Sequence, residues 1–228
     1  HSPLYNLLYS AWLSLVPSFS AMPSYKLTYF PVRARAEVAR QLFYLAGVPF
    51  EDVRVPHADW PALKPKTPFG QMPLLEVDGK PLPQSYAINR YLAKEFGFAG
   101  KSPFEAAWVD AIADQFKDYN IELRPLFLVL MGFAQGDKDQ LLKDVGIPAR
   151  DKFFGILEKL AKDNGNNGHF VGSSLTWADL LIADHVKTVS IHLPSFLDGF
   201  PTVLDTVKKI ESTPKLKEWI EKRPDTKF

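Results

Sequence analysis

Between Tyr25 and Gly97 the spacing of apolar residues changes from strand-like to helix-like and back, and this order restricts the fold more than any other feature of the chain. The run YKLTYF, which starts at Tyr25, alternates with a period of two, as a strand does. Residues 35–48 then place apolar side chains at helical spacing, with Gly47 as a C-cap, and residues 49–55 predict a second strand. A strand, a helix and a strand in this order predict a compact α/β unit.

The same unit continues with a hairpin and a second helix. Residues 56–73 are rich in proline and lysine and predict a loop, with one short helix near residues 60–63. Asp78-Gly79 separates two short apolar runs within residues 72–82, which is a strong hairpin signal. Residues 84–97 predict a helix that ends at a glycine. The unit is therefore expected to contain a mixed sheet.

After Gly100 the strand signals largely stop, and the remaining apolar patterns are helical. A length of 228 residues leaves room for two small domains. We predict an α/β domain at residues 22–100 and, after a short linker, an all-helical domain at residues 103–228. Helices are expected in this second domain at residues 104–132, 138–163, 177–190, 203–212 and 216–221.

A helix start is recognisable in the run LTWADL at residues 175–180. Thr176 is a suitable N-cap, and Asp179 stands at the third helical position, from which an acidic side chain can reach the amide of the cap residue. We therefore predict a structural role for Asp179 at the start of a buried helix.

The first 21 residues contain no Asp, Glu, Lys or Arg, and their longest run between prolines has 13 residues. That run is too short to span a bilayer comfortably. The end of the segment resembles a signal-peptidase site, but no basic residue precedes the apolar run. We favour a leader or an added extension before Met22, which fits a cytoplasmic protein, and a cleaved signal peptide is the alternative.

Composition excludes several kinds of chemistry. The chain has no cysteine, which excludes disulfides, cysteine-bound zinc, iron–sulfur clusters and a cysteine nucleophile. A net charge of +1 argues against a dedicated nucleic-acid binder. The charge is unevenly divided, because residues 1–102 carry a net +4 and residues 103–228 a net −3. An anionic ligand is therefore expected on the first half.

Two short motifs in that half are candidates for binding such a ligand. A cis bond in Gln71-Met72-Pro73 would turn the backbone of Met72 outward, where it could pair with a peptide-like ligand, although a trans turn is the commoner geometry. Gln84-Ser85 stands at a helix start, which suits a carboxylate but also suits an ordinary N-cap.

Further candidates lie near these motifs. Trp60 and Lys64 share the loop at residues 56–73, where a lysine beside an indole can hold an anion or simply stay solvated. Arg35 opens the first helix and is placed to face the mouth of a site near Tyr29.

Taken together, these segments resemble one family. The runs MPSYKLTYF, RARAE, DWPALKPKTPFGQMPLLEVDGK and QSYAINRYLAKEFG, followed by TWADL and WIEKRPDTKF, are similar to those of the cytosolic glutathione transferases. The resemblance covers Met22 to the end of the chain. It is strongest to the sigma class, which includes invertebrate enzymes and haematopoietic prostaglandin D synthase. It implies a thioredoxin-like domain with a mixed four-stranded sheet, then a helical domain, in a homodimer.

The resemblance also implies roles for individual residues. The catalytic tyrosine matches Tyr29, and its neighbouring arginine matches Arg35. The implied glutathione-binding residues are Tyr29, Trp60, Lys64, Gln71, Met72 through its backbone, cis Pro73, Gln84, Ser85 and, from the second subunit, Asp118. The electrophile pocket is expected between the domains, with Phe30, Val32, Ala34, Asn120 and Phe228 as candidates.

The implied chemistry uses glutathione as co-substrate, without a metal, a membrane or nucleic acid. A free thiol has a pKa of about 8.5, so little of it is ionised at neutral pH. A hydroxyl donated by Tyr29 and the positive field of Arg35 would favour the thiolate. Lowering the pKa of the thiol by about two units requires about 3 kcal/mol. The thiolate would then attack a small hydrophobic electrophile.

Three departures from the family pattern bear on alternative functions. Ala34 replaces the usual glycine, which would narrow the electrophile pocket or shift the backbone. Residues 120–128 lack the tryptophan of the prostaglandin synthase, and Lys117 interrupts its acidic cluster. Both points lower the expectation of a glutathione-dependent prostaglandin isomerase. A carrier of haem-like, planar apolar ligands and a structural relative such as a lens crystallin are the non-catalytic alternatives, and the intact Tyr29 argues against the latter.

Overall fold

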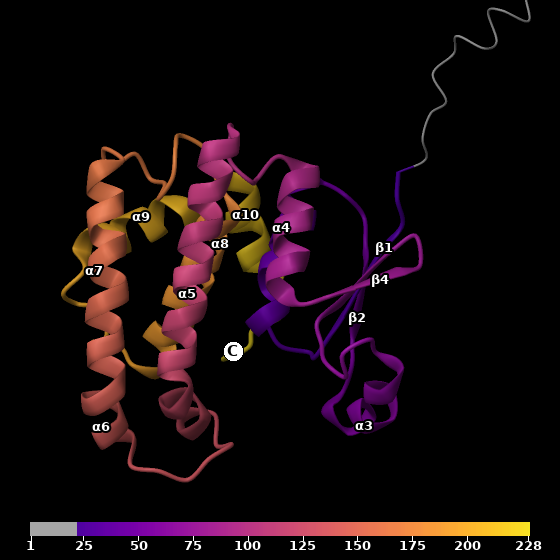
Figure 1. Ribbon diagram of the computed structural model, residues 1–228, viewed down its shortest axis with the longest axis horizontal. Coiled ribbons are helices and arrows are strands. Elements are labelled where there is room, and N and C mark those ends of the chain that lie inside the picture. Colours follow the sequence, from indigo (N-terminus) through magenta and orange to yellow (C-terminus); the bar gives the residue numbers. More distant parts are fainter. Residues whose placement is uncertain (1–21) are drawn as a thin grey trace, which may run out of the picture.

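The structure is a computed structural model, and it describes residues 22–228 (Figure 1). The predictions for residues 1–21 lie outside the described residues. One four-stranded sheet has the order β2-β1-β3-β4, in which β1 and β2 are parallel and the other pairs antiparallel. The mixed sheet predicted from the sequence is thus confirmed. Its strands are β1 Tyr25–Tyr29, β2 Glu51–Arg54, β3 Leu74–Val77 and β4 Lys80–Pro83.

Local sequence chemistry accounts for the turns of this domain. Asp78 and Gly79 have φ values of +49° and +76°, which are the two positive values that a tight hairpin of this type requires. Helix α2 (Glu37–Ala46) follows a 3-10 turn and ends at Gly47, whose φ is +69°. The predicted short helix is α3 (Trp60–Leu63). These expected turns and ends are confirmed.

Helices α2 and α4 (Ser85–Phe96) cover the sheet and pack against each other. Leu27 of β1 and Leu75 of β3 are completely buried, as are Leu42 and Ile88 on the two helices. The ring of Phe43 on α2 lies 5.1 Å from that of Tyr25, edge to face. The core of the first domain thus lies between the sheet and these two helices.

The second half of the described chain is helical, which confirms the predicted fold class (Figure 1). The segment predicted as one helix at residues 138–163 consists of two helices joined by a single π turn at residues 142–146. The domain limits of 22–100 and 103–228 stay a prediction. The helices are α5 Pro103–Leu130, α6 Lys138–Leu141, α7 Ile147–Asp163, α8 Trp177–His192, α9 Pro201–Glu211 and α10 Pro214–Lys222.

The predicted start of α8 is confirmed. Oδ2 of Asp179 accepts hydrogen bonds from the backbone N and the hydroxyl of Thr176, at 2.7 and 2.8 Å. Oδ1 accepts from the backbone N of Phe170 at 2.9 Å, a contact that the sequence did not predict. Because Asp179 is completely buried, its role is structural, and it joins the helix start to the preceding loop.

Candidate active site

Tyr29 is the last residue of β1, and its ring is almost completely buried. Burial raises the pKa of the Tyr29 hydroxyl, while a hydrogen bond from the backbone of Arg35 and the charges of Arg35 and Arg40 oppose the rise. The hydroxyl therefore keeps its proton at neutral pH. It can donate a hydrogen bond to an anion in front of it.

The loop after Tyr29 is held from behind by Arg40 of α2, whose side chain is completely buried. Its Nη1 and Nη2 donate to the carbonyl oxygens of Val32 and Phe30, at 2.6 and 3.4 Å, and its Nε lies 3.1 Å from Oδ1 of Asp52. Sequence reasoning missed this residue. Its effect is to fix the backbone between Tyr29 and Arg35.

Arg35 is exposed and stands in the 3-10 turn Ala34–Ala36. Its charge also acts on Tyr86, the residue after Ser85. Burial raises the pKa of Tyr86, and the charge of Arg35 opposes that rise. The charge of Arg35 thus opposes the rise in pKa of both Tyr29 and Tyr86. Tyr86 was not a candidate from the sequence.

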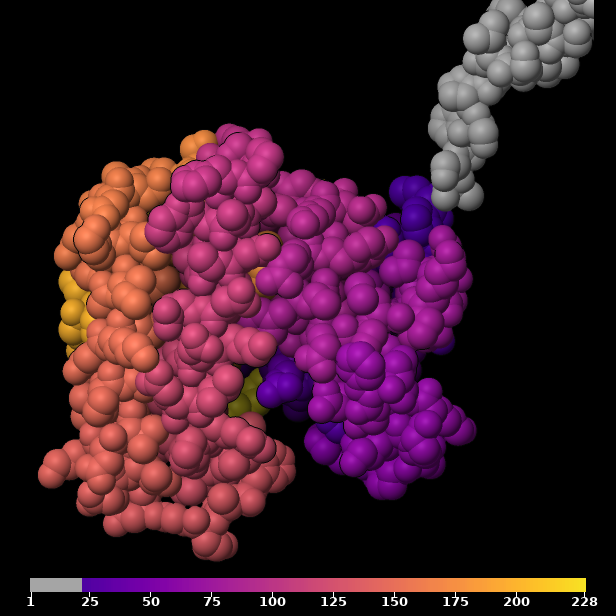
Figure 2. Space-filling view, viewed as in Figure 1, coloured from indigo at the N-terminus to yellow at the C-terminus, as the bar shows by residue number. Residues whose placement is uncertain are grey.

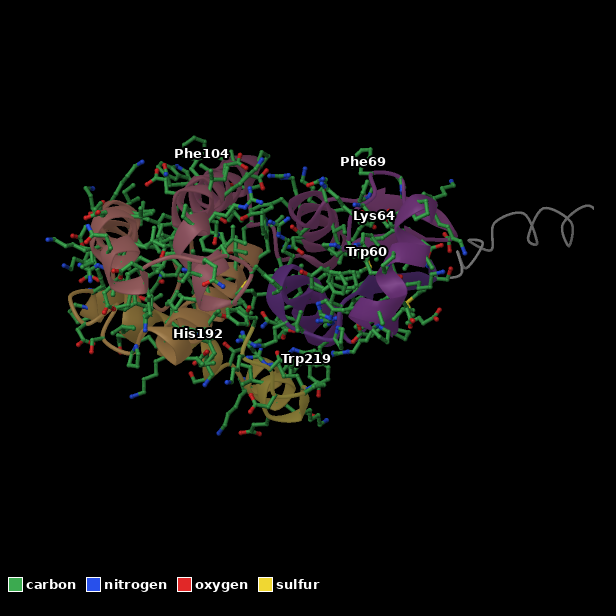
Figure 3. All side chains as sticks on the ribbon, turned by 90° about the horizontal axis from the view of Figure 1, so that it is seen from below. Trp60, Lys64, Phe69, Phe104, His192 and Trp219 are labelled. Atoms are coloured by element: carbon green, nitrogen blue, oxygen red, sulfur yellow. The ribbon has the colours of Figure 1, made fainter. Side chains whose placement is uncertain are left out.

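Phe30, predicted to line the electrophile pocket, packs on the side of the glutathione-binding candidates. Its ring stacks on His57 with the centroids 4.4 Å apart, and it meets Trp60 edge to face at 5.9 Å. Trp60 and Lys64 lie on the same part of the first domain (Figure 3). His57 is a further aromatic residue that the sequence did not single out.

The predicted motifs before β3 and before α4 come together. Nε2 of Gln84 donates to Oε1 of Gln71 at 3.0 Å, and Ser85 begins α4 as a buried residue. The Met72-Pro73 bond is cis, as the resemblance implied. Gln84 has a φ of +76°. Such a value is uncommon for a residue other than glycine, and such residues cluster at ligand sites.

Lys64 belongs to the same neighbourhood, because its side chain lies over Gly70, next to Gln71. Lys64 is exposed, so its ammonium group is accessible to an anion. The polar candidates of the first domain thus surround one short stretch of backbone at residues 70–72.

Asp118 and Asn120, both on α5, occupy a different part of the molecule. Asp118 is exposed. A hydrogen bond to Glu122, the charge of Glu122 and the charge of Asp118 raise the pKa of Lys152 on α7. No described contact joins Asp118 to the glutathione-binding candidates of its own chain. Asn120 is half-buried, and its side chain donates to the carbonyl of Phe116 at 3.0 Å.

Phe228 reaches the boundary between the domains. Its carbonyl accepts from the backbone N of Arg33 at 2.8 Å, within the loop that carries Val32 and Ala34, and its ring stacks on His192 at 4.1 Å. Figure 2 shows a hollow between the two domains, with residues of the C-terminal end, in yellow, at its floor. Three of the predicted pocket residues are therefore neighbours.

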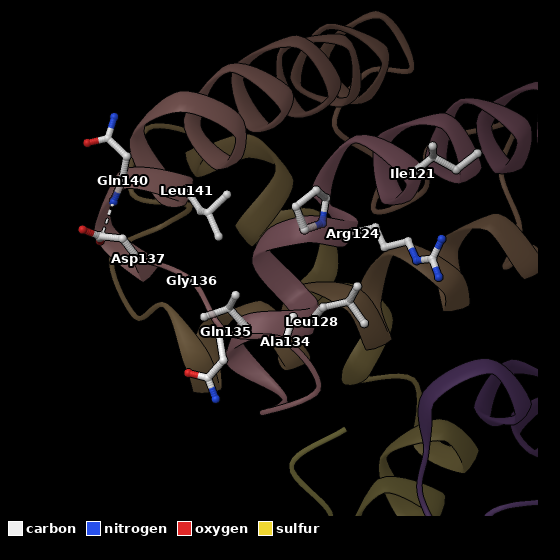
Figure 4. A pocket seen from close by; sticks show the side chains of 11 residues that line it. Ile121, Arg124, Leu128, Ala134, Gln135, Gly136, Asp137, Gln140 and Leu141 are labelled. Carbon is white, nitrogen blue, oxygen red and sulfur yellow. Dashed lines mark hydrogen bonds between the residues drawn. The ribbon is translucent and has the colours of Figure 1, made fainter.

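A separate hollow of about 670 Å³ lies beside the second half of α5 (Figure 4). None of the predicted site residues lines it. Ile121, Pro125 and Leu128 form its apolar wall, with Arg124 beside them. Among residues 22–228, no group of three or more His, Asp or Glu side chains is arranged to hold a metal ion. No helix in that part of the chain has the length and apolarity needed to cross a membrane.

A thioredoxin-like domain with a four-stranded mixed sheet, followed by a helical domain, is the two-domain architecture that the resemblance to the glutathione transferases implied. Two family profiles match the chain. The one described as the N-terminal domain of glutathione S-transferase matches residues 25–94, and the C-terminal domain profile matches residues 125–223. The chain therefore belongs to the glutathione S-transferase family, whose co-substrate is glutathione.

Nematode proteins are among its relatives. Glutathione S-transferase 1 of Ascaris suum is 53% identical over 207 residues, which cover 91% of this chain and all of that protein. The structure of a Nu-class glutathione S-transferase from Haemonchus contortus is 56% identical, with a TM-score of 0.84 over 91% of this chain and 100% of that one. A monomeric glutathione S-transferase from Necator americanus is 52% identical, with a TM-score of 0.87 over 90% of this chain and 100% of that one.

The structural relatives also include a more distant type. Prostaglandin synthase D of Nilaparvata lugens is 33% identical, with a TM-score of 0.79 over 89% of this chain and 100% of that one. The resemblance predicted from the sequence, which reached both transferases and prostaglandin synthases, is confirmed at the level of the family.

Proposed function

We propose that the protein conjugates glutathione to small hydrophobic electrophiles, with Tyr29 as the group that stabilises the thiolate. The observation that carries this proposal is the buried Tyr29 hydroxyl, which burial keeps protonated. A hydroxyl donates to a thiolate but gains less from a neutral thiol, so it lowers the pKa of the bound thiol. The charge of Arg35 acts in the same direction. The thiolate carries the electron pair to an electrophilic carbon, and the leaving group departs or a conjugated bond takes up the pair.

The polar candidates position glutathione in this proposal. Lys64 meets the glycyl carboxylate, and Gln71 and Gln84, which are hydrogen-bonded to each other, lie beside the γ-glutamyl end. Ser85 adds the positive end of α4, which favours a carboxylate. The backbone of Met72 pairs with the cysteinyl part of the peptide, and Pro73 follows it in the cis form.

We also propose that the protein is a homodimer in which Asp118 binds the amine of the partner's glutathione. Exposed Asp118 has no contact with the other candidates of its own chain, so a partner is needed to complete the site. Two large apolar side chains, Phe69 and Phe104, are 62% and 73% exposed and point to the same side of the molecule (Figure 3). In this proposal, the side of the molecule that carries both phenylalanines forms the dimer interface.

The class, the location and the biological role are part of the same proposal. Identity is higher to the Nu-class structure than to the prostaglandin synthase, at 56% against 33%. We place the protein near the Nu class, with sigma-type enzymes as more distant relatives, and in detoxification in the cytoplasm. Isomerisation of prostaglandin H2 and carriage of planar apolar ligands are less favoured, and a prostaglandin conversion assay and a haem titration test them.

Tyr29→Phe is the experiment that tests the main proposal. We expect the dissociation constant of glutathione to change little, because the backbone and Lys64 contacts remain. Turnover with 1-chloro-2,4-dinitrobenzene should fall at least about tenfold, since a charge-assisted hydrogen bond to the thiolate is lost. The absorbance of the bound thiolate near neutral pH should fall in parallel.

Tyr25→Phe is the matched control, because Tyr25 lies on the same strand and the same face, four residues away. It should leave turnover unchanged. Turnover in Tyr29→Phe equal to that of the wild type would remove Tyr29 from the mechanism.

A further inference from the structure

Arg33 lies between Tyr29 and Arg35 in the loop after β1, and its side chain is only 4% exposed. Its Nη1 lies 2.5 Å from Oδ1 of Asp184 on α8. A buried guanidinium is costly unless a carboxylate and further acceptors satisfy it. Further acceptors besides Asp184 are therefore needed to complete its hydrogen bonding.

The remaining acceptors of Arg33 lie in residues 226–228 and are the hydroxyl of Thr226 and three successive carbonyl oxygens. Nε donates to Thr226 at 3.3 Å, Nη2 to Lys227 at 3.4 Å, and the backbone N to Phe228 at 2.8 Å. His192 adds a second anchor, because its Nε2 lies 3.2 Å from the carbonyl oxygen of Lys227. We call residues 226–228 the tail segment.

Asp184 also binds Arg223, which lies three residues before the tail segment. Nη1 of Arg223 lies 3.4 Å from Oδ1 of Asp184 and 2.7 Å from Oε1 of Glu37, the first residue of α2. Trp219 of α10 donates to the same Glu37 oxygen at 2.7 Å. Burial and the charge of Glu37 raise the pKa of Asp184 to about 6, and Arg33 and Arg223 oppose the rise. The carboxylate is thus ionised at neutral pH and accepts from both arginines.

We propose that Arg33 is a positioning residue that holds the tail segment against the loop after β1 and thereby fixes the electrophile pocket. The inference rests on the proposed function, because Val32, Ala34 and Phe228 are candidates for that pocket. With Arg33 in place, the Phe228 ring stacks on His192 while its carbonyl oxygen is bonded to the loop. Without its guanidinium contacts, the ring is free to leave, and the pocket loses one apolar wall.

The test uses Arg33→Lys, a variant without Thr226–Phe228, and the combination of both. Lysine keeps the charge beside Asp184 and a backbone N–H at residue 33, but its side chain cannot reach two carbonyl oxygens at once. The KM for a long-chain α,β-unsaturated aldehyde should rise about fivefold in each single variant. The dissociation constant of glutathione should stay within about twofold, and the KM for the small electrophile 1-chloro-2,4-dinitrobenzene should rise less than the KM for the aldehyde. Lys208→Ala, an exposed change on α9, is the control.

The combined variant decides whether Arg33 acts through the tail. If it does, the combined variant should show the same rise in KM as the deletion alone, because one interaction cannot be lost twice. If the rise in KM of the combined variant equals the product of the two single rises, the proposal is overturned. An equal loss of turnover with both electrophiles would overturn it as well. The deletion leaves no buried carboxylate without its arginine. The deletion variant therefore still tests the role of the tail segment if Arg33→Lys fails to fold. An unchanged KM for the long-chain substrate in the deletion variant would refute the proposal.

Amide hydrogen exchange separates this inference from the proposed function. The backbone N–H of residue 33 donates to the Phe228 carbonyl, so it should exchange about tenfold faster once the tail segment is released. If the wild type conjugates nothing, the proposed function fails, and the exchange rates still report whether Arg33 holds the tail. Equal exchange rates in the wild type and both variants would contradict the inference.

Discussion

Ala34 carries the clearest local strain near the site. Its φ is +35°, in the left-handed region that costs an L-residue about 1–2 kcal/mol. Alanine therefore stands here in a conformation that favours glycine. The two consequences expected from the sequence, a narrower pocket or a shifted backbone, stay predictions. The loop keeps it because the residues just before Ala34 are anchored: Arg40 binds the carbonyl oxygens of Phe30 and Val32, and Arg33 binds Asp184.

We expect Ala34→Gly to stabilise the protein. Removal of the methyl group relieves the strain of about 1–2 kcal/mol, and the greater entropy of glycine in the unfolded chain takes back about 0.5–1 kcal/mol. The free energy of unfolding in urea should therefore rise by about 0.5–1 kcal/mol.

The control is Ala36→Gly, two residues further along the same 3-10 turn. Ala36 has a φ of −96° and is completely buried. Glycine there should destabilise by about 1 kcal/mol or more, since no strain is relieved and a buried methyl group is lost. A lower free energy of unfolding for Ala34→Gly than for the wild type would show that Ala34 is not strained in this loop.

Burial of charged residues was the part of the site that the sequence could not predict. Charged residues of an amphipathic helix normally face solvent, so Glu37 and Arg40 read as surface residues of the first helix. In the structure, α2 packs against α4 and, from the distant half of the chain, against α8 and α10. The carboxylates and carbonyls that satisfy Arg33 come from residues 184 and 226–228. A local pattern does not contain such contacts.

Among the elements, α8 depends most on a single side chain. Three donors converge on the buried carboxylate of Asp179, from Thr176 and from Phe170. Asp179→Ala would leave buried donors without a partner, each costing about 1–3 kcal/mol. We expect a loss of about 3–5 kcal/mol in the free energy of unfolding, within the range of a broken buried hydrogen-bond network.

Asp205→Ala is the comparison for Asp179→Ala. Asp205 is an exposed residue of α9 with one surface partner, Lys209, so its loss should cost no more than about 0.5 kcal/mol. Both variants should keep the kcat/KM of the wild type at temperatures where they are folded. A change in kcat/KM for the folded Asp179 variant would instead give that residue a role in the site.

Element boundaries were predictable where local chemistry sets them and not where packing does. The hairpin at Asp78-Gly79 and the end of α2 at Gly47 follow from turn residues alone. The π turn at residues 142–146 does not. A Cβ on Gly146 would lie 2.9 Å from Cδ2 of Leu126 on α5, so a larger residue here would force that leucine side chain to shift. That contact joins residues 20 positions apart and has no signature in a helical pattern.

At the scale of the whole molecule, the sequence predicted which half of the chain binds the anionic ligand. The net charge of +4 on residues 1–102 and −3 on residues 103–228 pointed to an anionic ligand on the first half. The polar candidates of that half do come together, through the Gln71–Gln84 bond and the position of Lys64 over Gly70. The sequence could not say how a second copy would meet the first, because an interface between chains depends on surfaces, not on local patterns.

Asp118→Ala tests how the site is completed in the assembled protein. If Asp118 binds the amine of glutathione held by the partner, its loss should weaken glutathione binding about tenfold, the value of about 1.4 kcal/mol expected for one hydrogen bond between charged groups at a partly exposed site. Calorimetric titration gives the dissociation constant, and sedimentation shows whether the variant is still dimeric. Asp205→Ala, remote on α9, should bind as the wild type does.

The Necator americanus relative is monomeric, so the oligomeric state of this protein has to be measured together with its affinity. Dilution below the dimer dissociation constant should weaken glutathione binding in the wild type, but should leave Asp118→Ala unchanged, because that variant has already lost the contact across the interface. A monomer that binds glutathione as tightly as the dimer, or an Asp118→Ala dimer with wild-type affinity, would show that each subunit builds its site alone.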